Sequence, residues 1–226
     1  MSASRLWVAL DTPSLATAEA WIRALWPHRH YKVGLELFTR AGPEAVARWA
    51  REGCAIFLDL KLHDIPHTVA GAVAAARELG AEMVTVHASG GPAMLEAAAQ
   101  AKGAMAVVAV TVLTSLEGRD LARLGWSGET AELVRRWAEL AHSCGVDGVV
   151  CSAHEVADLR QIWPESRRVV PGLRLLAGTE ADQKRVATPW AAVQAGATDL
   201  VVGRAVTQDP EPARRLAEVL QAIGAR

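Results

Sequence analysis

The sequence predicts one (β/α)8 barrel domain over residues 1–226. Short apolar runs alternate with Ala-, Leu- and Arg-rich stretches of helical spacing, and eight such pairs fill the chain. The apolar runs are continuous rather than alternating, which is typical of parallel strands buried on both faces. Several helical stretches end at glycine, a common residue just beyond a helix C-terminus. A doubly wound open sheet stays the alternative, because periodicity alone does not exclude it.

The expected elements follow one another at short intervals. The strands are Leu6–Leu10, Tyr31–Gly34, Ile56–Leu60, Met83–His87, Ala106–Val110, Gly148–Cys151, Val169–Pro171 and Leu200–Gly203. The spacing predicts helices over Leu15–Leu25, Pro43–Glu52, Val69–Leu79, Pro92–Ala101, Glu129–Cys144, Glu155–Ile162, Trp190–Ala195 and Pro210–Ile223. Two longer connections, Leu113–Ser127 and Gly172–Pro189, leave C-terminal strand ends, where barrels place their active sites.

Composition argues against several classes of protein. The net charge of −1 gives no global field for nucleic acid or an anionic membrane, so we expect neither as a partner. The longest apolar stretches, such as Met105–Val110, are too short to span a bilayer, and the N-terminus lacks the long apolar region of a signal peptide. Three cysteines without metal-ligand spacing argue against disulfides. We therefore expect a cytoplasmic protein.

The segment Phe57–Pro66 carries the strongest chemical signal. Asp59 and Lys61 are two residues apart, so on a strand their side chains point to the same face. A charged pair at the end of an apolar strand is costly unless it pairs well or has a function. Taken alone, the two residues leave open a structural ion pair that only closes the barrel end.

Neighbouring strands add charges to the same rim. Asp11 ends the first expected strand, Lys32 ends the second, and Asp64 lies just beyond Lys61. Charges of alternating sign stabilise one another and form a preorganised electrostatic site that needs no metal. Only four of the 24 Lys and Arg residues are lysine, so a retained lysine has a raised chance of donating a proton, which arginine scarcely does.

Two histidine pairs have spacings that resemble metal sites. We interpret His28 and His30 as exposed residues and His63 and His67 as loop residues, so no metal is expected. A phosphate site is predicted instead between the last two strands, where barrels often bind phosphate. Its candidate residues are Gly203, Arg204, Arg174 and Gln183.

Together these segments resemble the orotidine 5′-phosphate decarboxylase family. The motif Asp59-x-Lys61-x-x-Asp64-Ile65-Pro66-x-Thr68 is similar to the hallmark of that family. Further similar segments follow in order over nearly the whole chain: Ala9–Asp11, Tyr31–Phe38, Val86–Ala88, Leu113–Ser115, Asp147–Ser152, Pro171–Arg174, Asp182–Pro189 and Val201–Arg204. His67 and Leu175–Ala181 depart from the family pattern.

The resemblance implies a homodimeric (β/α)8 barrel that converts orotidine 5′-phosphate to UMP and CO2 without metal or organic cofactor. It implies that Lys61 donates the proton to C6, that Asp59 lies beside the departing carboxylate, and that Lys32 holds Asp59 and touches the ribose. The partner subunit would supply Asp64, Ile65 and Thr68. The other implied substrate contacts are Asp11 with a ribose hydroxyl, Thr114 with the base, Gln183, Gly203 and Arg204 with phosphate, and Arg174.

Three alternatives stay open from the sequence. The first is a Mg²⁺-dependent sugar-phosphate decarboxylase on the same barrel, which shares the Asp-x-Lys-x-x-Asp pattern. The second is an aldolase that forms a Schiff base at Lys61, which the two neighbouring carboxylates disfavour. The third is a barrel that only binds a nucleotide phosphate.

Overall fold

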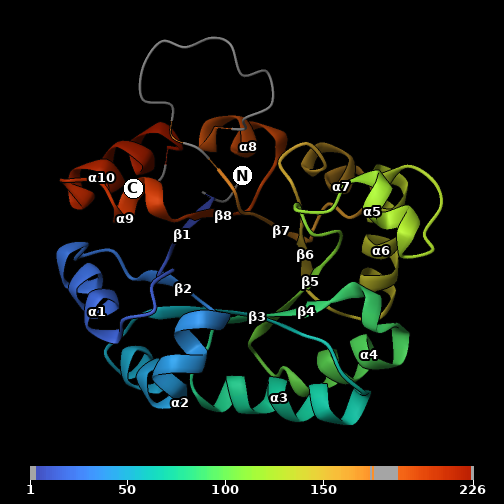
Figure 1. Ribbon diagram of the computed structural model, residues 1–226, viewed down its shortest axis with the longest axis horizontal. Helices are drawn as coiled ribbons and strands as arrows, with labels where there is room; N and C mark the ends of the chain where they lie inside the picture. Colours follow the sequence, from blue (N-terminus) through green and yellow to red (C-terminus); the bar gives the residue numbers. More distant parts are fainter. Residues whose placement is uncertain (1–3, 174, 176–187, 225–226) are drawn as a thin grey trace.

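Strands β1 to β8 close into a parallel barrel in chain order, with the helices around its outside (Figure 1). This computed structural model describes residues 4–173, 175 and 188–224. β8 pairs with β1, which closes the sheet. The predicted (β/α)8 barrel is therefore confirmed, and the open-sheet alternative is wrong.

The elements alternate as strand and helix along the chain. The strands are β1 (Arg5–Ala9), β2 (His30–Gly34), β3 (Ala55–Leu62), β4 (Met83–His87), β5 (Ala106–Val110), β6 (Gly148–Val150), β7 (Arg167–Val170) and β8 (Asp199–Val202). The helices are α1 (Leu15–Ala24), α2 (Leu35–Arg51), α3 (Pro66–Glu78), the 3-10 turn η1 (Ala88–Gly90), α4 (Pro92–Ala101), α5 (Gly118–Arg123), α6 (Thr130–Ser143), α7 (Val156–Ile162), α8 (Pro189–Ala195), α9 (Arg204–Thr207) and α10 (Pro212–Ala222).

The continuous apolar runs form strands with two buried faces. Side chains on the inner face of the strands fill the barrel with a cluster around Trp7, Phe57, Met83 and Val108. The alternate side chains along each strand point outward and pack against the helices. Because side chains alternate across a strand, each run must be apolar on both faces. This arrangement explains why the sequence shows no simple alternation of polar and apolar residues.

Two differences from the predicted helices have local causes. Helix α2 begins at Leu35 rather than Pro43, and Gly42 interrupts it with φ 71° and ψ 177°, so the sequence pattern revealed only its second part. Helix α5 lies inside the connection expected to be a loop. Its N-terminus is fixed by reciprocal hydrogen bonds between Glu117 and Asp120, an acidic variant of the usual Ser/Thr capping box.

A buried carboxylate reinforces the seam between β1 and β8. Asp199 accepts hydrogen bonds from Trp7 Nε1 at 2.8 Å and from Arg167 Nη2 and Nε at 3.0 and 3.1 Å. Its side chain is 2% exposed. The three residues come from β1, β7 and β8, so this contact ties the last strands to the first.

We expect Asp199→Ala to destabilise the fold strongly. The substitution leaves the Trp7 N–H and the Arg167 guanidinium without their buried acceptor, which costs about 3–5 kcal/mol. Urea denaturation measures this change. Glu139→Ala, which removes an exposed ion pair with Arg135, is the control and is expected to change stability by less than about 1 kcal/mol. Equal losses for the two variants would contradict the assignment.

Candidate functional site

Four charged side chains of alternating sign lie in a row at the C-terminal rim of the barrel. Lys32 Nζ is 3.1 Å from Asp11 Oδ1 and 3.5 Å from Asp59 Oδ2. Lys61 Nζ is 2.7 Å from Asp59 Oδ1. The structure therefore brings together Asp11, Lys32, Asp59 and Lys61, which the sequence places on three separate strands or strand ends.

The register of neighbouring strands produces this row. Lys32 pairs with Ala9 of β1 and Phe57 of β3, while Gly34 is opposite Asp59. Lys32 thus lies in the middle of β2, not at its end as the sequence analysis expected. A Cβ atom on Gly34 would lie 3.3 Å from Lys32 Nζ, which is a tight contact. Glycine at this position leaves room for the lysine ammonium.

Lys61 has an unusual backbone conformation. Its φ angle is 51°, and residues other than glycine rarely adopt a positive φ. The β3–β4 pairing is irregular at the same place, because Leu58 pairs with Val84 but Leu62 pairs with Val86. β3 therefore bulges around Asp59–Lys61. Bulges of this kind re-aim side chains beside active sites, so Lys61 reaches Asp59 through the bulge and not through a regular strand.

Asp59 is the electrostatic centre of the row. Burial alone raises its pKa, but attraction by Lys32 and Lys61, with hydrogen bonds from Lys61 and Thr85, outweighs burial and holds the pKa below the ordinary 3.8. Its side chain is 17% exposed, against 30% for Lys61 and 9% for Lys32. Asp59 is therefore an ionised carboxylate with little contact to solvent.

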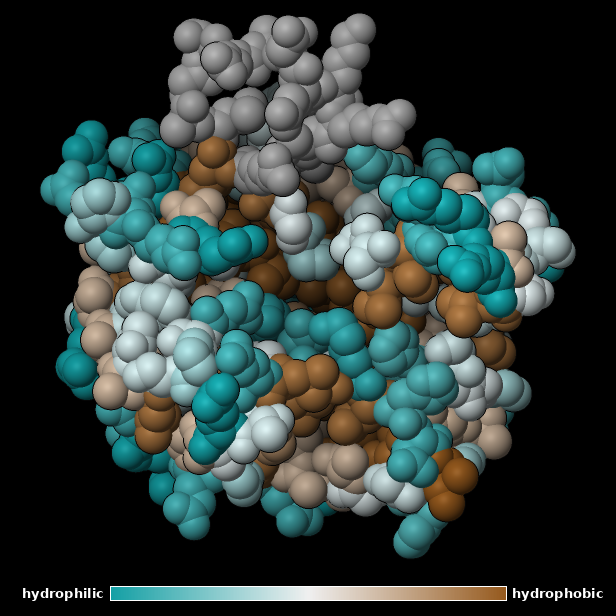
Figure 2. All heavy atoms as spheres, in the orientation of Figure 1, coloured by the Kyte–Doolittle hydropathy of each residue, from teal (hydrophilic) through white to brown (hydrophobic). Residues whose placement is uncertain are grey.

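A cavity of about 210 Å³ lies next to these charges. Lys32, Asp59 and Lys61 form its charged side, and Thr114 follows β5 at its edge. The rest of the lining is mostly apolar: Phe57, Val110, Val112, Leu113, Val150, Cys151, Val169, Pro171 and Val201. Figure 2 shows hydrophobic residues inside a central hollow and hydrophilic residues beside it. Such a cavity suits a flat ring that packs against apolar side chains and makes a few polar contacts.

The end of the hallmark motif lies apart from this row. Within the described part of the chain, Asp64 makes no ion pair, and its Oδ1 accepts a hydrogen bond from the Ile65 N–H at 2.6 Å. Every residue from His63 to Thr68 is exposed, and Ile65 is 66% exposed. The structure of this chain therefore does not bring Asp64, Ile65 or Thr68 into an ion pair or hydrogen bond with Lys61.

The candidate phosphate residues are only partly described. Gly203 caps the start of α9 and Arg204 is its first residue, with an exposed side chain. A Cβ atom on Gly203 would lie 3.6 Å from both Ala9 and Asp11. Arg174 and Gln183 lie outside the described residues. The structure thus places Gly203 and Arg204 beside the β1 end of the rim.

The histidine pairs differ from each other in their surroundings. His28 and His30 are half-buried rather than exposed, and burial lowers the pKa of His28 to about 4, so it is neutral near pH 7. His63 lies in a loop as predicted, but His67 is on α3; both are exposed, and the His63 ring lies 5.5 Å from that of His87. No group of three or more His, Cys, Asp or Glu side chains among the described residues is arranged to hold a metal ion.

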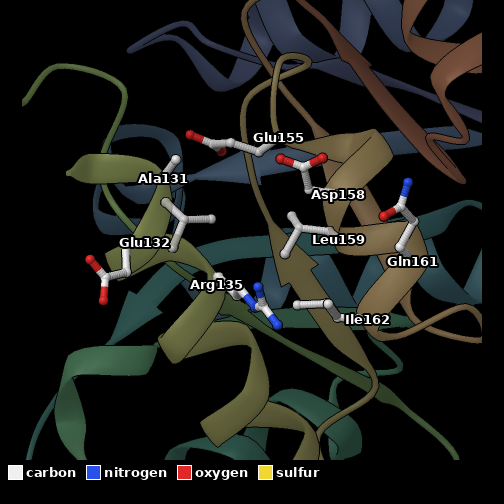
Figure 3. A pocket seen from close by; sticks show the side chains of 9 residues that line it. Ala131, Glu132, Arg135, Glu155, Asp158, Leu159, Gln161 and Ile162 are labelled. Atoms are coloured by element: carbon white, nitrogen blue, oxygen red, sulfur yellow. The ribbon is translucent and has the colours of Figure 1, made fainter.

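A second hollow, of about 410 Å³, lies between α6 and α7 on the outside of the barrel (Figure 3). Glu132, Arg135, Glu155 and Asp158 line it. Glu155 Oε2 already accepts a hydrogen bond from the Ser152 N–H at 2.7 Å. Burial raises the pKa of Glu155, which the contacts with Ser152 partly oppose. These mixed and partly engaged charges do not form a reaction centre.

Thr85 is a further residue of the site, which the sequence pattern did not indicate. Thr85 is buried on β4, and its hydroxyl contacts both Lys61 and Asp59. The only signal was a polar residue two positions from Met83 in an apolar strand. The cysteines Cys54, Cys144 and Cys151 are free and buried. No helix in the described ranges has the length and hydropathy needed to cross a membrane.

Comparisons with known proteins point to one family. A family model described as "Orotidine 5'-phosphate decarboxylase / HUMPS family" matches residues 4–219. The curated orotidine 5'-phosphate decarboxylase of Halorhodospira halophila is 49% identical over 227 residues, which cover 98% of this chain and 96% of the relative. The protein of the same name from Anaeromyxobacter sp. (strain K) is 49% identical over 212 residues, covering 92% and 93%.

Two solved structures share the fold and much of the sequence. The orotidine 5'-phosphate decarboxylase of Lactobacillus acidophilus has a TM-score of 0.89 and 33% identity, covering 98% of this chain and all of the other. An uncharacterized conserved protein from Geobacillus kaustophilus has a TM-score of 0.85 and 35% identity, covering 96% and 99%.

We expect Lys32→Met to raise the pKa of Asp59, because the substitution removes the stronger of the two Coulombic attractions on it. A carboxyl-detected NMR titration measures this pKa directly. Since the folded-state pKa lies below 3.8, ionised Asp59 contributes stability that is present above that pH and is lost as pH falls. Lys102→Met, which removes an ion pair with Asp147 elsewhere, is the control. An unchanged Asp59 titration in Lys32→Met would refute this electrostatic assignment.

Proposed function

Because the chain belongs to the orotidine 5′-phosphate decarboxylase / HUMPS family, we propose that it converts orotidine 5′-phosphate to UMP and CO2. This reaction is the last step of de novo UMP biosynthesis, and the enzyme is a carboxy-lyase. The observation that carries the proposal is the contact of Lys61 Nζ with Asp59 Oδ1 at 2.7 Å beside a cavity that suits a pyrimidine ring.

The difficult part of the reaction is the negative charge left on C6. When the bond to the carboxylate breaks, CO2 departs and an electron pair stays on a ring carbon that delocalises it poorly. The Lys61 ammonium stabilises this charge by Coulomb attraction in a cavity of low dielectric, and then transfers a proton to C6. Arginine would be a poor replacement, because it scarcely releases a proton.

Asp59 and Lys32 prepare Lys61 for this role. Asp59 accepts a hydrogen bond from the Lys61 ammonium and so fixes its position. Lys32 contacts both Asp11 and Asp59 and holds that carboxylate in turn. Asp59 would also lie near the substrate carboxylate, which raises the energy of the bound substrate. We assign the larger effect to transition-state stabilisation by Lys61.

The remaining contacts would bind parts of the substrate that do not react. Asp11 binds a ribose hydroxyl and Thr114 the base. Gly203 and Arg204 hold the phosphate together with Gln183, and Arg174 is a further substrate contact. Phosphate binding far from C6 supplies energy that orients the base against Lys61. The exposed guanidinium of Arg204 next to the cap residue Gly203 is suited to a phosphate group.

We also propose that the active form is a homodimer with shared sites. Asp64, Ile65 and Thr68 would complete the site of the partner subunit, alongside that subunit's own lysines. The exposure of the whole segment from His63 to Thr68, including a large apolar side chain, supports this arrangement. The three free cysteines are consistent with a cytoplasmic location, which we propose as well.

A direct absorbance assay for loss of orotidine 5′-phosphate tests the proposed function. We expect turnover in the presence of EDTA, whereas the alternative Mg²⁺-dependent sugar-phosphate decarboxylase would not act on this substrate. Lys61→Ala is expected to reduce turnover by about 10⁴-fold or more while the circular dichroism spectrum is unchanged. Lys102→Ala, another ion-paired lysine, should keep wild-type activity. Near-wild-type turnover by Lys61→Ala would overturn the mechanism.

Subunit complementation tests the shared site. Lys61→Ala and Asp64→Ala are each expected to be inactive as pure proteins. A hybrid dimer contains one site with both intact residues, so an equimolar, fully exchanged mixture should recover about one quarter of wild-type activity. Native mass spectrometry verifies the exchange. Exchange without recovered activity would count against a site built from two subunits.

A further inference from the structure

Thr85 is a polar side chain enclosed beneath the charged row. It lies on β4 between Met83 and His87, and it is 0% exposed. β4 runs directly beside β3 in the barrel wall (Figure 1). Met83 belongs to the cluster that fills the barrel, so by strand alternation Thr85 also faces the interior. Among the described residues, those that line the cavity include Asp59 and Lys61 but not Thr85.

Thr85 on β4 lies directly opposite the bulge in β3. Leu58 pairs with Val84 and Leu62 pairs with Val86. The single residue Thr85 therefore lies opposite the three residues from Asp59 to Lys61. A regular ladder cannot satisfy the backbone groups of a strand that is longer than its partner.

The Thr85 hydroxyl makes two hydrogen bonds that span this bulge. It accepts from the Lys61 backbone N–H at 2.7 Å and donates to Asp59 Oδ1 at 3.1 Å. The same Asp59 oxygen accepts from Lys61 Nζ at 2.7 Å. The three contacts close a ring in which Thr85 holds the backbone of Lys61 while Asp59 holds its ammonium.

We propose that Thr85 is a positioning residue for the decarboxylation, and that its hydroxyl fixes the Lys61 ammonium and the Asp59 carboxylate against the substrate. This inference rests on the proposed function. Thr85 acts through Lys61 and Asp59 and does not touch the substrate itself.

Physical reasons favour a role in geometry over a role in stability alone. A backbone with φ of 51° is strained for lysine and persists only where surrounding contacts impose it. Without the hydroxyl, the Lys61 backbone N–H loses its acceptor, and the backbone around Lys61 is free to shift. Asp59 also loses one of the hydrogen bonds that lower its pKa. Small displacements of a reacting group cause large losses of rate.

The chain provides a matched control at the opposite end of the barrel. The Thr198 hydroxyl also accepts from a backbone N–H, that of Arg168, at 2.9 Å and donates to a carboxylate, that of Asp199, at 2.8 Å. Thr85→Val and Thr198→Val therefore remove the same two kinds of hydrogen bond, and valine keeps the branched shape of threonine. Only Thr85→Val removes hydrogen bonds to residues of the site.

The experiment measures kcat and KM for orotidine 5′-phosphate in wild type, Thr85→Val, Thr85→Ser and Thr198→Val, with active sites counted by titration. We expect Thr85→Val to lower kcat by about 10- to 100-fold with KM within about threefold. Thr85→Ser, which keeps the hydroxyl, should restore most of kcat. In Thr85→Val the acid limb of the kcat/KM profile should move to higher pH, because the pKa of Asp59 rises. Thr198→Val should keep kcat and lose only stability.

Other outcomes separate this inference from the proposed function. A wild-type protein without decarboxylase activity would refute the proposed function itself. An active wild type with equal kcat in Thr85→Val and Thr198→Val would refute the role of Thr85 alone. If Thr85→Val does not fold, Thr85→Ala and Thr85→Ser make the same comparison, and equal kcat in that pair would also refute it.

Discussion

The site depends on the Asp59 carboxylate, which is held between two lysine ammonium groups at the rim of the barrel. Burial opposes its negative charge, and the two lysines more than offset that penalty. The arrangement works only if both ammonium groups stay within contact distance. The barrel register fixes Lys32, and the β3 bulge fixes Lys61. Backbone geometry thus controls the electrostatics of the site.

The two ends of the barrel use similar ionic contacts for different purposes. Asp199 is buried and bonded to residues of adjoining strands, and it lines neither the 210 Å³ cavity nor the 410 Å³ hollow. Asp59 has a comparable number of partners but borders a cavity that Lys61 also lines. Enclosed charges stabilise a unique closure of the barrel, while charges beside a cavity can act on a ligand. This difference in surroundings distinguishes a structural carboxylate from a functional one.

Sequence patterns predicted the barrel and the charged row because both follow from simple rules. Consecutive apolar residues predict strands with two buried faces, and charged residues at the ends of such strands meet at one rim. The α5 helix was missed because its capping residues are acidic, and the bulge at Lys61 was missed because Thr85 is distant from Lys61 in sequence. A side chain that bonds to the backbone of another strand leaves no periodic signal. Roles for Arg174 and Gln183 stay predictions from resemblance.

On the proposed function, the balance of charges in the row explains why one part of the site binds the substrate and another part accelerates the reaction. Asp11, Lys32, Asp59 and Lys61 carry two negative and two positive charges that are already paired. Such a row offers little net attraction to a substrate carboxylate, so affinity must come from the phosphate end. As CO2 leaves, negative charge concentrates on C6, and attraction to Lys61 increases. The row therefore favours the transition state over the bound substrate, which is the condition for raising kcat.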